Sequence, residues 1–94
     1  MRDRVIDALH CRSPEGAARG AFVVIDGVQR LGHPADQVIA LGCAYKNFCE
    51  VLVLDPMEVL RVVSRMEQDC RFRQVTTLSA VRKYAERELL PHFA

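Results

Sequence analysis

This sequence of 94 residues lacks an excess of either charge, because its thirteen Lys and Arg residues nearly balance its twelve Asp and Glu residues. Proteins dedicated to nucleic acids usually carry a clear basic excess, so the net charge of +1 argues against that class. Long apolar runs are absent too, because the longest without glycine covers only residues 21–25 and is far too short to cross a bilayer. Asp3 and Asp7 interrupt the N-terminus, which shows no apolar stretch of signal-peptide length. We therefore expect a soluble, cytoplasmic protein that does not contact a membrane.

Motifs that hold a metal or a phosphate group are also missing. The sequence has no Cys-x-x-Cys pair, no His-Glu-x-x-His motif and no glycine-rich loop. We expect the cysteines to be small buried apolar residues of a protein in a reducing compartment; they are Cys11, Cys43, Cys49 and Cys70. The alternative of a reactive thiol stays open at Cys11, which lies beside His10 near a helix end. The sequence thus predicts a protein that is not an enzyme and has no catalytic residue, cofactor or metal.

Apolar residues repeat with the period of an α-helix in five segments, and none of the segments alternates as a strand does. Ser13 before Pro14, and Asp55 before Pro56, are strong helix start signals, whereas Gly32 is typical of a helix C-terminus. Either Thr76 or Thr77 suits the start of the last helix. The predicted helices cover approximately residues 2–10, 14–31, 34–52, 56–70 and 78–90. Because every connection is short, we expect one all-α domain over residues 1–94, a compact bundle of about five helices.

The third predicted helix is apolar over most of its circumference, which is typical of the central helix of a bundle. The residues of this broad apolar arc are Val38, Leu41, Ala44, Tyr45, Phe48, Val51 and Leu52. Ile39 and Cys43 fall on its polar side instead. Met57 and Leu60 likewise lie off the core stripe of the fourth helix, which consists of Val59, Val62, Val63, Met66 and Cys70. Apolar residues outside the core favour a homodimer interface or a surface for a protein partner, although single exposed apolar residues are also ordinary.

The stretch from residue 49 to 66, CEVLVLDPMEVLRVVSRM, resembles a helix-turn-helix unit. In that template the turn residue is usually a glycine in a left-handed conformation, which the β-branched Val53 disfavours. The face that would enter the major groove carries the bulky apolar Met57 and Leu60 and a single cation, Arg61, a poor set for base edges. We therefore expect a corner in a bundle. The DNA-binding alternative would rest on four arginines: Arg61, Arg65, Arg71 and Arg73.

Three short runs are similar to small uncharacterised proteins of temperate phages and prophages of proteobacteria. These runs are LGHPADQVIAL at 31–41, FCE at 48–50 and LDPMEVL at 54–60, within a resemblance that covers roughly residues 13–66. The resemblance implies a compact helical protein of a mobile element, with a host or phage protein as its partner and no site residues to carry over. Val53 departs from the pattern, since glycine is more usual there.

The sequence therefore predicts a small non-catalytic interaction or regulatory protein that acts through protein–protein contacts. Its partner is expected to be a second copy of the chain, a host or phage protein, or both. The alternative is a helix-turn-helix-like regulator that binds DNA.

Overall fold

The computed structural model describes residues 2–72 and 79–93, and every regular element in these two ranges is helical. The helices are α1 (Arg2–His10), α2 (Pro14–Val28), α3 (Pro34–Leu52), α4 (Pro56–Phe72) and α5 (Ser79–Tyr84). Short helical turns extend two of them: η1 (Gln29–Leu31) after α2, and η2 (Ala85–Leu89) and η3 (Leu90–His92) after α5. The all-α prediction is confirmed, and α1 to α4 begin at the predicted residues. The predicted caps Thr76 and Thr77 lie outside the described residues.

The helix starts are fixed by local hydrogen bonds that the sequence signalled. The Ser13 hydroxyl accepts a hydrogen bond from the backbone N–H of Gly16 at 3.0 Å, and Asp55 Oδ1 accepts one from that of Met57 at 2.9 Å. In both helices a proline occupies the first position, where no N–H is needed. His33 caps α3 in the same way, because its Nδ1 accepts a hydrogen bond of 3.1 Å from the first turn. These caps satisfy backbone donors that a helix leaves without partners.

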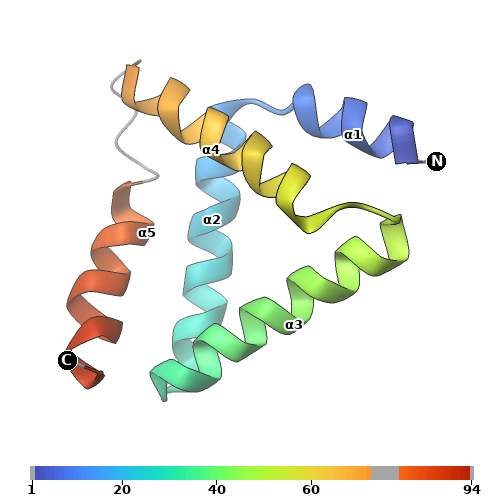
Figure 1. The fold of residues 1–94 in the computed structure, drawn as a ribbon. Helices are drawn as coiled ribbons and strands as arrows, with labels where there is room; N and C mark the ends of the chain where they lie inside the picture. The colour runs from blue at the N-terminus through green and yellow to red at the C-terminus, as the bar shows by residue number, and fades with distance from the viewer. Residues whose placement is uncertain (1, 73–78, 94) are drawn as a thin grey trace.

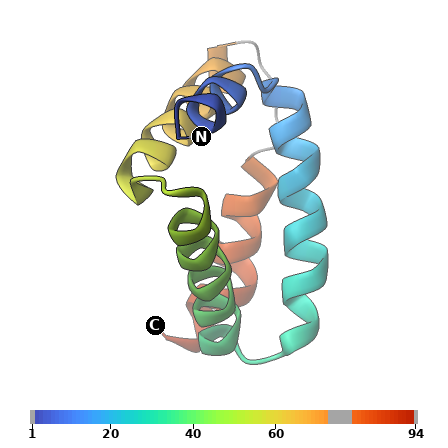
Figure 2. The same cartoon turned by 90° about the vertical axis from the view of Figure 1, so that its right-hand side faces the viewer.

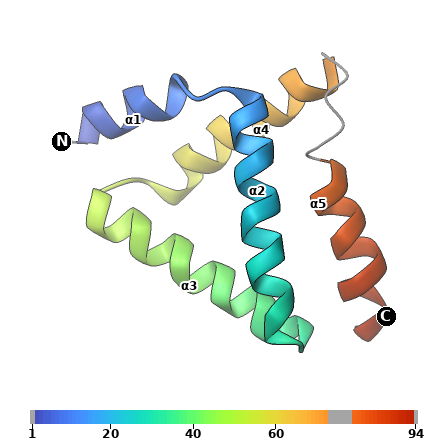
Figure 3. The same cartoon turned by 180° about the vertical axis from the view of Figure 1, so that it is seen from behind.

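Helix α2 contacts α3, α4 and α5, while α1 packs on α4. In Figures 1 and 3, α1 and α4 lie across one end of α2, whereas α3 starts at the other end and diverges from it. Helix α5 runs alongside α2 in Figures 1 and 2, and the two helices are in contact. The Tyr84 hydroxyl donates a hydrogen bond of 2.7 Å to Gln37 Oε1 and so links α5 to α3. Gln37 is 3% exposed, and its Nε2 donates to the carbonyl of Gly32 at 3.1 Å.

The prediction that α3 is the central helix is wrong for the single chain. Val38, Phe48 and Val51 were expected in the core, but they are 55%, 68% and 75% exposed. Within the described ranges, the main neighbours of α3 are η1 and α2 near its start and α4 near its end, and much of its apolar surface stays exposed. The buried apolar side chains of the described residues are few, namely those of Ala18, Pro34, Cys49 and Val62.

Between α3 and α4 the chain turns by 113° within three residues, 53–55. Over the described residues, no single helix is long and apolar enough to cross a membrane, and α3 and α4 pass that test only as a bent pair. The expectation that Val53 avoids a left-handed turn is wrong, because its φ is 54° and its ψ is 53°. A left-handed conformation costs an L-residue about 1–2 kcal/mol.

Backbone hydrogen bonds explain why Val53 adopts this conformation. Its own N–H donates to the carbonyl of Glu50 at 3.3 Å, and the N–H of Leu54 donates to that of Cys49 at 2.8 Å. This pair of bonds is the Schellman motif, which satisfies carbonyls at a helix C-terminus and requires one left-handed residue. The Tyr45 hydroxyl donates a further hydrogen bond to the carbonyl of Pro56 across the turn. Together these bonds fix the direction in which α4 leaves α3.

Candidate interaction surfaces

The exposed side of α4 brings together four residues that the sequence singled out. Met57 and Leu60 are 56% and 44% exposed and lie one helical turn apart. They line a shallow hollow of about 330 Å³ together with two arginines and two uncharged polar residues. We call this set the α4 surface: Met57, Leu60, Arg61, Ser64, Arg65 and Gln68. The two alternatives drawn from the sequence, a protein interface and a DNA contact, therefore concern a single patch.

The charge of the α4 surface is modest. Arg65 Nη1 lies 3.4 Å from His10 Nδ1, which accepts its hydrogen bond and joins α4 to α1. One of the two arginines of this surface thus has a hydrogen bond within the chain, but it keeps its positive charge, so both arginines can still pair with a carboxylate. The side chain of Arg71 and the whole of Arg73 lie outside the described residues, so their contribution stays a prediction.

Ile39 and Cys43 lie one turn apart on α3, and both are exposed, with Ile39 at 67%. Polar groups surround them. Lys46 Nζ forms an ion pair of 2.7 Å with Glu50 Oε1, and this hydrogen bond raises the pKa of Lys46 above its usual value. Asn47 Nδ2 donates to the carbonyl of Cys43 at 2.8 Å. This side of α3 is therefore a mostly polar surface, and the two apolar residues on it do not form a continuous patch.

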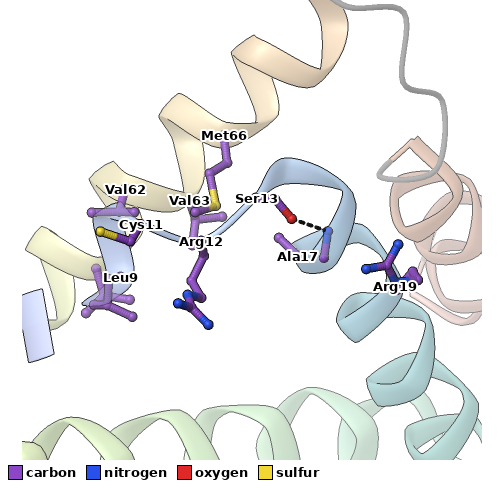
Figure 4. Close-up of a pocket in the computed structure, with 11 residues that line it drawn as sticks. Leu9, Cys11, Arg12, Ser13, Ala17, Arg19, Val62, Val63 and Met66 are labelled. Carbon is purple, nitrogen blue, oxygen red and sulfur yellow. Dashed lines mark hydrogen bonds between the residues drawn. The ribbon is translucent and has the colours of Figure 1, made fainter. Parts of the chain in front are cut away.

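A groove of about 630 Å³ opens between α1, the start of α2 and α4 (Figure 4). Val59, Val62, Val63 and Met66 of α4 and Leu9 of α1 form its apolar lining. The groove was not predicted, because the same α4 residues were assigned to the core. Of these, Val62 is buried as predicted, whereas Val63 is 43% exposed. The turn of α2 that faces them contains Gly16 and Ala17, whose small side chains leave the space open. The small residues at the start of α2 are the sequence feature that could have predicted the groove.

The cysteine prediction is confirmed at one position and wrong at two. Cys49 is buried, with 3% exposure, whereas Cys11 and Cys43 are exposed. Cys11 lies in the connection between α1 and α2 and lines the groove (Figure 4). The side chain of Cys70 lies outside the described residues.

Polar groups gather at the other end of the bundle, in a cleft of about 520 Å³ that includes Gln37, Tyr84, Glu88 and His92. Gln37 and Tyr84 bind each other there, as described above. Among the residues that the structure describes, no three His, Cys, Asp or Glu side chains come together as metal ligands. The contact between α3 and α5 therefore accounts for the polar groups that gather in this cleft.

Comparison of this chain with protein-family models, with curated proteins and with solved structures found no match. The similarity to phage and prophage proteins stays a prediction.

Proposed function

We propose that this protein is a non-catalytic interaction protein and that the α4 surface binds a partner protein. The observation that carries the proposal is the exposure of Met57 and Leu60 beside Arg61 and Arg65 in one shallow hollow. Methionine and arginine are enriched in protein interfaces, whereas lysine and glutamate are depleted. A flexible methionine side chain also adapts to the shape of a partner.

The chemistry of the α4 surface favours an amphipathic helix with an acidic edge as its ligand. Apolar side chains of such a helix would cover Met57 and Leu60, and its carboxylates would pair with Arg61 and Arg65 at the border of the contact. A host or phage protein is the source that the sequence resemblance suggests.

DNA binding is the second candidate, and one observation favours it. The turn of 113°, the three connecting residues and the left-handed Val53 fit the helix-turn-helix geometry of two helices at about 90–120°. The chemistry of α4 opposes it, because two bulky apolar side chains occupy the face that would enter a groove, and Arg65 is held by His10. The corner therefore supplies the shape without the usual base-reading groups.

Affinity capture from the lysate of the source cell tests the proposal with three baits: the wild type, Leu60→Glu and Val23→Glu. Val23 is 73% exposed on α2 and serves as the matched control. A protein retained by the wild type and by Val23→Glu, but lost from Leu60→Glu, supports the α4 surface. A fourth bait, Arg61→Ala, should then retain the same protein more weakly. Identical sets of captured proteins on all three baits would count against it.

The DNA alternative needs a separate measurement, the fluorescence anisotropy of a mixed-sequence duplex at low salt. Binding that weakens as salt rises, and that weakens further in Arg61→Ala, would replace the protein-binding proposal with a DNA-binding one. An unchanged anisotropy at low salt removes the alternative.

A further inference from the structure

A stripe of apolar side chains runs along one side of α3 over its C-terminal half. Its members recur at intervals of three and four residues, the spacing at which one helix packs against another in a coiled coil. We call this set the α3 stripe: Leu41, Ala44, Phe48 and Val51. All four are exposed, Leu41 at 39%, Phe48 at 68% and Val51 at 75%. The same spacing continues back to Gln37 and Pro34, which are buried where α3 has neighbours.

The chain also exposes more surface than its mass requires. Its accessible surface is 7139 Å², whereas a monomeric protein of 10.6 kDa exposes about 5,500 Å². Its radius of gyration is 14.2 Å, against about 12 Å for a compact chain of this length. The excess, about 1,700 Å² per chain, would come to roughly 3,400 Å² for a pair of chains. Obligate dimers bury about 2,000–5,000 Å², so the chain as a whole has enough excess surface for a stable dimer.

Charge does not oppose contact between two such helices. Lys46 and Glu50 lie on the opposite side of α3 from the α3 stripe, and their ion pair of 2.7 Å neutralises both charges. Two copies of α3 can therefore approach without like charges meeting across the contact.

We propose that two copies of this chain pair through their α3 stripes, antiparallel, about a two-fold axis at the level of Lys46. Leu41 then faces the partner's Val51, and Ala44 faces the partner's Phe48. Each large aromatic ring meets a small side chain, which is how well-packed helices interlock. A parallel pairing would set Phe48 against the partner's Phe48 and leave a void beside Ala44. The inference concerns a different helix face from the α4 surface and goes beyond the proposed function.

Sedimentation equilibrium of the full chain over a concentration series tests the pairing. The expected mass is twice 10.6 kDa, and the midpoint of thermal unfolding should rise with protein concentration, as it does for a dimer. A mass of 10.6 kDa at every concentration, or an assembly larger than two chains, overturns the inference.

Charge variants test the antiparallel direction. Leu41→Glu and Val51→Lys should each weaken the dimer by more than about 100-fold, because each places an unpaired charge in the contact twice. The double variant should recover most of this loss, since the introduced carboxylate faces the introduced ammonium of the partner. In a parallel pair the double variant would bring like charges together and bind more weakly than either single one, which would overturn the antiparallel arrangement.

Two control variants separate this inference from the proposed function. Val23→Lys, on α2, and Leu60→Glu, on the α4 surface, should stay dimeric. A dimer lost in Leu60→Glu but kept in the stripe variants places the contact on the α4 surface and overturns the inference. If a stripe variant loses its helical circular dichroism while Val23→Lys keeps it, the result supports the pairing, because Val51 is 75% exposed in a lone chain and a charge there should be tolerated.

Discussion

Replacing Val53 by asparagine should stabilise the protein. Val53 has a φ of 54° and a ψ of 53°, a conformation that costs an L-residue about 1–2 kcal/mol. Asparagine enters this region more readily, because its short polar side chain bonds locally. The valine side chain is 64% exposed, so the substitution forfeits only about 0.5 kcal/mol of apolar burial. We therefore expect Val53→Asn to raise the free energy of unfolding by about 0.5–1 kcal/mol.

Glycine at the same position separates backbone strain from side-chain effects. Val53→Gly removes the strain too, but it adds about 0.4–1 kcal/mol of conformational entropy to the unfolded chain, so its net effect should be close to zero. We expect Val53→Asn to be the most stable of the three proteins, with Val53→Gly and the wild type close together below it. Urea unfolding at one fixed protein concentration measures all three, because the stability of a dimer depends on concentration.

Val23→Asn is the matched control, since Val23 is 73% exposed within α2 and both residues have similar helix propensities. It should change stability by less than about 0.5 kcal/mol. If Val53→Asn destabilises the protein by more than about 1 kcal/mol while the control is neutral, the left-handed turn is not the source of strain at this corner.

Other contacts of the fold lead to three more predictions. Ser13→Ala and Asp55→Ala should each lower the free energy of unfolding by about 1 kcal/mol through loss of a helix cap, as urea titration can show. Tyr84→Phe should cost about 1–3 kcal/mol in the same assay, because it leaves the buried Gln37 oxygen without its donor. Burial, followed by a hydrogen bond with Cys49, raises the pKa of Tyr45 above 10.0. The stabilisation from its neutral phenol is therefore complete below that value and is lost as pH rises through the raised pKa, and Tyr45→Phe should abolish this alkaline loss.

The helix starts were predictable because each depends on a few neighbouring residues. A cap and a proline, as in Ser13-Pro14 and Asp55-Pro56, specify a helix start without help from the rest of the chain. The left-handed Val53 was not predictable from residue preference. Its conformation follows from hydrogen bonds that close the end of α3, and these outweigh the local disfavour of a β-branched residue.

As with Val53, the burial of the α3 side chains depends on groups outside the local sequence, so it could not be predicted. Periodicity shows which side chains are apolar, but it does not show whether the neighbour that covers them belongs to the same chain. Phe48 and Val51 were predicted to be core residues, and in the proposed dimer they would lie in the core of the pair. The α4 surface was easier to predict. Met57 and Leu60 lie off the stripe of Val59, Val62 and Met66, and both are exposed. This spacing is a property of one helix and does not depend on the elements packed around it.

The turn of 113° between α3 and α4 has a consequence for how tightly a partner is held. Because of this turn, α3 and α4 point in different directions. A dimer joined through α3 would therefore carry two α4 surfaces related by the two-fold axis. A partner that offers two linked copies of its binding helix could then occupy both at once. Its second attachment would be intramolecular, which multiplies apparent affinity by about 10²–10⁴ when the linker spans the distance. Weak single contacts at Met57 and Leu60 would then suffice for firm, bivalent attachment.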